Sequence, residues 1–187
     1  MKKNLLSFLL CLISFTTFSQ EEETKVFEGF NGFPWGTTVE EIKKTKIITM
    51  SNNDAIEEKL EITHYNEINS TGDEIRVYSF KSNELFAGEI IYINPDSYKI
   101  KAITSKIIKT YGYLIETAER ADFFMGQPCK KYNCRKDINK NFTISLTLIS
   151  ETETGKIEFV QLSFWNPTIT DQIIELSKQF YEEELSF

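Results

Sequence analysis

Residues 142–165 read FTISLTLISETETGKIEFVQLSFW, and the predicted fold follows from the pattern of this segment. From Phe142 to Leu148, apolar side chains alternate with hydroxyl side chains, and a similar alternation returns between Val160 and Phe164. Alternation of this kind predicts strands with one buried face and one solvent-exposed face. A Thr-Gly turn signal separates the two runs, so we predict an antiparallel hairpin.

The predicted solvent face of this hairpin is the candidate binding surface. Its hydroxyl and amide side chains are flanked by two aromatic side chains, a combination that suits contact with a carbohydrate or a protein. An ordinary solvated sheet face is the alternative interpretation. The residues of the candidate surface are Thr143, Ser145, Thr147, Phe159, Gln161, Ser163 and Trp165.

The rest of the chain predicts a second hairpin and two long helices. Residues 75–80 and 85–93 are rich in β-branched and aromatic residues and flank a turn signal. Each hairpin is followed by Asn-Pro and then by a helical pattern, from about Ser97 to Tyr111 and from about Ile169 to Tyr181. We predict an α+β fold, an antiparallel sheet with helices on one face, with two ββα units as one interpretation. The inward face predicted for the first helix consists of Ile100, Ile103, Ile107, Ile108 and Tyr111.

A long connection over residues 113–140 is predicted between the two units. It contains Cys129 and Cys134, with four residues between them. In an oxidising compartment, so close a pair predicts a local disulfide. A redox-active pair is the alternative, although such pairs favour two intervening residues.

Two short helices are predicted ahead of the first hairpin. The pairs Thr37 with Glu40 and Thr38 with Glu41 both fit a capping box, so a helix should start near Thr38. Residues 51–54 offer a second N-cap, for a helix through Leu60. Aromatic side chains just before the first helix are interpreted as anchors that lock the chain onto the core. These anchors are Phe30, Phe33 and Trp35.

The first twenty residues read MKKNLLSFLLCLISFTTFSQ and contain the three parts of a secretory signal. Lys2 and Lys3 are basic, residues 5–15 are apolar, and Thr17 and Ser19 are small residues ahead of a cleavage site. The apolar run is shorter than the roughly 20 residues that a transmembrane helix needs. We predict a signal peptide over residues 1–19, a single α+β domain over residues 20–187, a periplasmic or secreted location, and no transmembrane segment after cleavage.

The composition excludes several function classes. Asp and Glu number 28 against 21 Lys and Arg, which gives a formal net charge of −7 and argues against a nucleic-acid partner. Hydrophobic residues make up 41% of the chain, so the chain is expected to fold. The glycine-containing stretch near the N-terminus lacks the P-loop and dinucleotide-binding patterns, so no cofactor is predicted.

The sequence carries few signs of catalysis. His64 is the only histidine, and neither a nucleophile elbow nor a zinc motif is present, so we interpret His64 as a surface residue and predict no metal site. We predict a non-catalytic binding or envelope-associated protein, with an unknown protein or carbohydrate of the envelope as partner. The alternatives are a carboxylate-dependent hydrolase of envelope polymers and an inhibitor or immunity-type protein that blocks an exported enzyme.

Residues 29–42, GFNGFPWGTTVEEI, resemble the opening of a largely uncharacterised group of small exported bacterial proteins. In that group an aromatic residue, Trp-Gly, one or two hydroxyl residues and a Glu-Ile or Glu-Val helix follow the signal peptide. The later order is also similar, with a hairpin, a helix that ends in Tyr-Gly (here Tyr111 and Gly112) and a second hairpin. The resemblance implies a location and a fold more than an activity.

Overall fold

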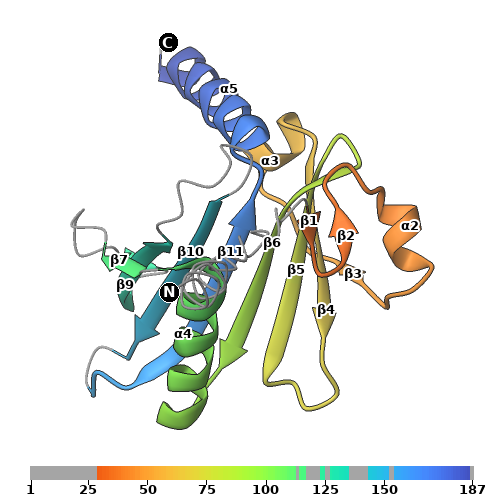
Figure 1. The fold of residues 1–187 in the computed structure, drawn as a ribbon. Helices are drawn as coiled ribbons and strands as arrows, with labels where there is room; N and C mark the ends of the chain where they lie inside the picture. The colour runs from red at the N-terminus through yellow and green to blue at the C-terminus, as the bar shows by residue number, and fades with distance from the viewer. Residues whose placement is uncertain are drawn as a thin grey trace, which may run out of the picture.

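The computed structural model describes residues 29–112, 114–116, 123–124, 127–134, 143–151 and 154–185, and the fold is built around a large antiparallel sheet (Figure 1). The strand order is β3-β4-β5-β6-β11-β10-β9-β7, and β8 pairs with β9. The strands are β1 (Gly29–Phe30), β2 (Phe33–Pro34), β3 (Thr49–Met50), β4 (Ile62–Ile68), β5 (Glu74–Lys81), β6 (Glu84–Ile93), β7 (Leu114–Glu116), β8 (Phe123–Phe124), β9 (Gln127–Cys134), β10 (Thr143–Ser150) and β11 (Ile157–Trp165). The helices are α2 (Val39–Lys43), α3 (Ala55–Lys59), α4 (Ser97–Tyr111) and α5 (Pro167–Leu185).

Both predicted hairpins are confirmed. β5 and β6 pair antiparallel with Tyr78 opposite Gly88, and β10 and β11 pair with Leu146 opposite Leu162. The turn of the first hairpin contains Ser82 and Asn83 at φ values of 49° and 70°, as a two-residue turn between twisted strands requires. The predicted α+β class is therefore confirmed.

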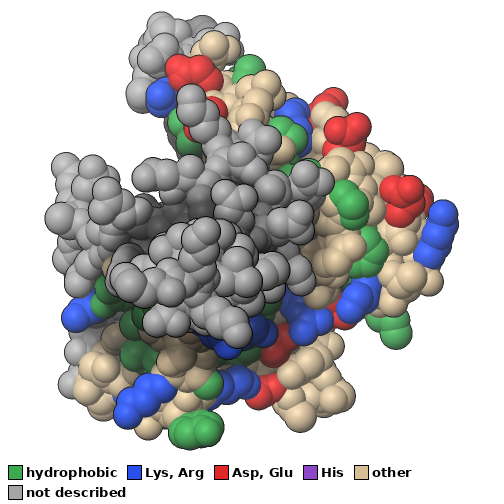
Figure 2. Space-filling model, viewed as in Figure 1, with side chains coloured by type: hydrophobic (Ala, Val, Ile, Leu, Met, Phe, Trp, Pro, Cys, Tyr) green, Lys and Arg blue, Asp and Glu red, His purple; other side chains and the backbone are tan. Residues whose placement is uncertain are grey.

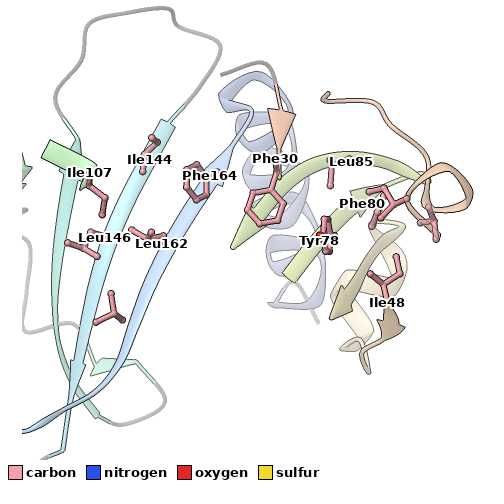
Figure 3. Packing of buried hydrophobic residues seen from close by; sticks show 13 residues of the cluster. Phe30, Ile48, Tyr78, Phe80, Leu85, Ile107, Ile144, Leu146, Leu162 and Phe164 are labelled. Carbon is pink, nitrogen blue, oxygen red and sulfur yellow. The ribbon is translucent and has the colours of Figure 1, made fainter. Parts of the chain in front are cut away.

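One face of the sheet carries the larger hydrophobic core, and we refer to it as the α4 face (Figure 3). Tyr78, Leu162 and Phe164 are buried there, and Ile107 of α4 packs against them. Phe30 of the β1–β2 hairpin is 1% exposed, and its ring centroid lies 5.2 Å from that of Tyr78. Phe33 and Trp35 pack against the same core, so the predicted anchoring role of these aromatic residues is confirmed. The remaining buried members of this core are Val39, Ile42, Ile48, Phe80, Leu85, Ile144, Leu146 and Val160.

The opposite face, the α5 face, carries a second and smaller core. Ile62 and Phe86 are buried there, and side chains of α5, among them Ile173 and Phe180, pack against them. The two long helices therefore lie on opposite faces of the sheet, and the prediction that the helices share one face is wrong. A two-fold axis normal to the sheet, between β6 and β11, would relate the two ββα units and would place both helices on the same face. Because the helices lie on opposite faces, the two units follow one another in the chain without being related by that symmetry.

The connection over residues 113–140 is not the loop that the sequence predicted. It contributes β7 and β9, and β9 extends the sheet by pairing with β10. Cys129 lies opposite Ile149 on one neighbouring strand, and Cys134 lies opposite Leu114 on the other. Five residues of extended strand separate the Cα atoms of the two cysteines by about 16 Å, whereas a disulfide needs about 4.4–6.8 Å. The predicted disulfide is therefore incompatible with this strand.

The short helices form where the capping signals predicted them. Thr38 caps α2 in a capping box with Glu41, and Asp54 caps α3. Of the residues predicted to face inward from α4, Ile108 is 43% exposed, because it lies about 100° around the helix from the buried Ile107. Among the helices that the structure describes, none has the length and apolar character needed to cross a membrane.

Candidate functional site

The structure brings the seven predicted surface residues together on the α5 face. Thr143 lies opposite Trp165, Ser145 opposite Ser163, and Thr147 opposite Gln161, while Phe159 lies one pair further along, opposite Ile149. Side chains of opposite residues share a face in an antiparallel sheet. The alternation in the sequence therefore predicted the grouping of these residues.

The alternation did not predict how exposed these residues are. Ser145 is 2% exposed, Thr147 9% and Gln161 8%, so the expectation of a solvated face is wrong at these three positions. Ser163 and Trp165 are half-buried, as is Phe159, and the exposure of Thr143 lies outside the described residues. An alternating pattern identifies which residues share a face, but it carries no information on whether another layer covers the face.

Glu89 of β6 extends this polar row, although the sequence pattern did not predict it as a site residue. It lies opposite Ser163 on β11, and the Ser163 hydroxyl donates a hydrogen bond of 3.1 Å to Oε1 of Glu89. Ser145 follows on the next strand, so an acid and two hydroxyls lie side by side across three strands. In the sequence, Glu89 is the single carboxylate within the largely apolar residues 85–93, and this isolated charge could have indicated the site.

Next to the polar row, the α5 face becomes apolar, and we refer to this part as the apolar ladder. The pairing continues from strand to strand, with Ile68 of β4 opposite Ile75, Ile75 opposite Ile91, and Ile93 opposite Phe159. Ile68 is 62% exposed and the other four residues are half-buried. Neither of the two cores formed by the described residues includes these five side chains.

β6 carries apolar side chains on both faces of the sheet. Ile90 and Tyr92 point to the α4 face, where they pack against the larger core, and Ile91 and Ile93 point to the α5 face. A strand that is apolar on both sides is typical of a sheet covered by a layer on each face. The described side chains of α5 pack near Phe86, at the other end of β6 from the ladder. The ladder is thus an apolar surface without a layer among the described residues.

A charged network lies on the α4 face. The Tyr78 hydroxyl donates a hydrogen bond of 2.6 Å to Glu67, and Lys46 donates one of 3.0 Å to the same carboxylate. Arg76 lies 3.6 Å from Glu67 and 2.6 Å from Glu74. Figure 2 shows acidic and basic side chains intermingled over the lower part of β4 and β5. The network borders a hollow of about 30 Å³, enough for about one water molecule.

The electrostatics of this network bear on the hydrolase alternative. Burial raises the pKa of Glu67, but hydrogen bonds from Tyr78 and Lys46, together with the charges of Lys46 and Arg76, outweigh it, so the net shift is downward. A general acid in glycoside hydrolysis needs a raised pKa. Burial and the adjacent Glu67 raise the pKa of the Tyr78 hydroxyl, which keeps it a hydrogen-bond donor. The arrangement suits a fixed ion-pair network rather than proton transfer to a substrate.

His64 takes part in a second polar arrangement, on the α5 face. Its Nδ1 lies 2.8 Å from the hydroxyl oxygen of Ser79, and its Nε2 lies 3.1 Å from Oε1 of Glu57. The order serine, histidine, acid is that of a hydrolytic triad. Ser79, however, is 6% exposed within β5, where both neighbouring strands pair with it, so a substrate has little access. The arrangement ties α3 to β4 and β5, and His64 is half-buried rather than free on the surface.

In the part of the chain that the structure describes, no three His, Cys, Asp or Glu side chains gather as ligands for a metal ion. Comparison with protein-family models, with curated proteins and with solved structures found no match to this chain.

Proposed function

We propose that the chain is an exported, non-catalytic binding protein that contacts a protein partner of the cell envelope through the apolar ladder. The observation that carries this proposal is the row of Ile68, Ile75 and Ile91 across three strands, continued by Ile93 and Phe159. These side chains are apolar, partly exposed and outside both cores. Contiguous apolar surface of this kind is typical of interaction sites.

The shape and the surroundings of the ladder favour a protein over a carbohydrate. The ladder side chains are spread over neighbouring strands of one sheet face, whereas small ligands are usually held in concave pockets. Glu89 and Ser163 border the ladder and supply half-buried polar groups near its rim. An apolar centre with a polar margin is the usual composition of a protein interface. An inhibitor or immunity-type protein is one form of this proposal.

Export is the second part of the proposal, and it rests on the signal in residues 1–19. Intact-mass analysis of the protein recovered from the periplasm and the medium is expected to show a chain that begins at Gln20. Recovery of the uncut chain from the cytoplasm would contradict export.

The binding surface is tested with a double variant, Ile75→Thr with Ile91→Thr. Threonine keeps the β-branched shape that a strand favours, while two apolar contacts with a partner are lost. We expect an envelope protein that is retained by the wild-type chain to be bound at least about tenfold more weakly by this variant.

The matched control is Ile108→Thr with Ile174→Thr, because these two isoleucines are 43% and 47% exposed on helices. The control is expected to retain the same envelope protein as the wild-type chain. Thermal unfolding of both double variants shows whether they are folded. Equal retention by the ladder variant and the wild-type chain would overturn the proposed surface.

A further inference from the structure

The outward side of helix α4 is basic. From Ser97 to Gly112 the sequence contains four lysines and neither Asp nor Glu, although the whole chain has a formal net charge of −7. One of the four, Lys99, is used within the fold, because its Nζ lies 2.8 Å from Oδ2 of Asp73 and 5.1 Å from the ring centroid of Tyr92. The other three are exposed, and none of them forms an ion pair with a carboxylate of the described residues. They are Lys101, Lys106 and Lys109.

These three lysines share one side of the helix with two exposed side chains that are largely apolar. Tyr98 is 81% exposed and Ile108 is 43% exposed. At about 100° per residue, all five side chains fall within an arc of about 160°. The buried Ile107 lies opposite the middle of that arc. We refer to the five residues as the outward face of α4, and they are Tyr98, Lys101, Lys106, Ile108 and Lys109.

A further lysine lies on β9, which contacts α4. Lys130 is opposite Leu148, whose side chain packs against the larger core, so Lys130 also points to the α4 face of the sheet. Lys130 is exposed. Figure 2 shows basic and hydrophobic side chains next to one another at the lower end of α4. The positive charge therefore extends from the helix onto the neighbouring strand.

We propose that the outward face of α4 docks the protein on a lipid surface with anionic headgroups. Each lysine close to such a surface adds to the attraction. Tyrosine is enriched at membrane interfaces, because its ring is apolar and its hydroxyl stays hydrated. A helix that lies in the interface inserts apolar side chains and keeps its lysines at the headgroups. Tyr98 and Ile108 supply the first kind of contact, and the three lysines supply the second.

The arrangement favours a lipid surface over a nucleic acid or an acidic protein. Along the helix axis, Lys101 and Lys109 are about 12 Å apart, so a planar array of headgroups contacts all three lysines at once. A lipid interface also has an apolar layer below its charges, which accepts Tyr98 and Ile108. A nucleic acid offers no such layer and is repelled by the net charge of −7.

Docking through α4 leaves the apolar ladder accessible. The ladder lies on the α5 face, on the other side of the sheet from α4, so it is directed away from the lipid surface. The docking does not rest on the proposed partner binding. It is measured with the purified chain and lipid alone, so the failure of either idea leaves the other intact.

Co-sedimentation with lipid vesicles tests the proposal. The purified protein is mixed with vesicles of phosphatidylcholine and phosphatidylglycerol in equal parts, or with vesicles of phosphatidylcholine alone. The wild-type chain is expected to bind only the vesicles that contain the anionic lipid. Raising the salt from about 0.1 M to about 1 M is expected to release it, because the Debye length falls from about 10 Å to about 3 Å.

A triple variant, Lys101→Gln with Lys106→Gln and Lys109→Gln, removes the charge of the outward face. Glutamine has nearly the helix propensity of lysine. We expect the partition coefficient onto the anionic vesicles to fall at least about tenfold. The matched control removes three exposed lysines elsewhere, and it is expected to keep at least most of the binding. The control is Lys44→Gln with Lys156→Gln and Lys178→Gln.

The two triple variants have the same net charge, so they differ only in where the lysines were lost. Equal binding of the wild-type chain to both kinds of vesicle would overturn the proposal, as would equal partition of the α4 variant and the wild-type chain. An equal loss of binding in both triple variants would also overturn it, because general charge would then explain the attraction. No binding to the anionic vesicles would overturn it too and would leave an acidic protein as the counterpart of α4. Circular dichroism shows whether each variant is folded.

Discussion

Tyr78 links the hydrophobic core to the charged network on the α4 face. Its ring is buried against Phe30, and its hydroxyl lies 2.6 Å from both Glu67 and the side-chain amide of Asn31. A donor that serves a carboxylate inside a partly buried site contributes more than an exposed hydrogen bond. The phenol oxygen is therefore a point at which apolar packing and charge stabilise the same region.

Tyr78→Phe is expected to lower the free energy of unfolding by about 1.5–3 kcal/mol, because the Glu67 carboxylate loses a hydrogen bond. Urea denaturation measures the change. Tyr98→Phe is the control, since Tyr98 is 81% exposed, and it is expected to leave stability unchanged. A Tyr78→Phe variant as stable as the control would contradict the role given to this hydroxyl.

Glu67 makes stability depend on pH in a predictable direction. Its pKa in the folded protein lies below the ordinary value of 4.5, so the unfolded chain takes up a proton more readily than the folded chain. The stability from this carboxylate is present above the ordinary pKa and is lost as pH falls through the folded-state pKa. Glu67→Gln should therefore show a shallower loss of stability than the wild-type chain between about pH 5 and pH 3.

Denaturation midpoints across this pH range test the prediction. Glu58→Gln, at an exposed position on α3, is the control and is expected to keep the wild-type profile. Parallel profiles for Glu67→Gln and the wild-type chain would show that the network does not hold Glu67 ionised.

At the scale of the elements, the β1–β2 hairpin approaches the sheet closely at Gly88 of β6. A Cβ atom added at Gly88 would overlap the ring of Phe30, which lies directly above it. This approach lets Phe30 reach Tyr78 and Phe164, with ring centroids 5.2 Å and 5.6 Å away. Glycine is required at position 88 because a side chain there would occupy the space that the Phe30 ring fills.

Gly88→Ala is expected to cost about 1–3 kcal/mol through overpacking. The cost should be smaller in a chain that already carries Phe30→Ala, because the clashing ring is then absent. A double-mutant cycle measured by urea denaturation gives the coupling between the two residues. Additive effects would mean that Gly88 is required for another reason.

β9 gives a direct chemical test of the fold, because Cys129 and Cys134 lie five residues apart on one extended strand. In protein that is denatured without reductant, both thiols are expected to be alkylated, and peptide mapping identifies the two sites. A peptide that is two protons lighter and unmodified at both cysteines would show that this strand is not extended as described.

The elements that the sequence predicted well are those with local signals. The hairpins follow from period-two alternation, and α2 and α3 follow from capping residues such as Thr38 and Asp54. β9 was missed because QPCKKYNC has no alternation of its own, and its place depends on pairing with β10. The side of the sheet to which α5 packs was also not predictable, because an amphipathic helix fits either face.

In the molecule as a whole, the sequence grouped the candidate residues on one face correctly, but it did not predict that three of them are buried. Ser145 and Gln161 share a face as predicted, but they are buried, whereas Ile68 of β4 on the same face is 62% exposed. Whether a sheet face is covered depends on distant segments, here α5 beside Phe86. The sequence predicted that β6 is rich in apolar residues. It did not predict that Ile91 lies outside both cores formed by the described residues.

Binding of a protein partner by the apolar ladder is tested by site-specific photo-crosslinking in the cells that make the protein. A photoreactive phenylalanine analogue replaces Ile91 in one variant and Tyr98 in another. Irradiation is expected to give a discrete adduct with a different protein from position 91 and none from position 98. No adduct at position 91, an adduct with a second copy alone, or the same adducts from both positions would contradict the claim.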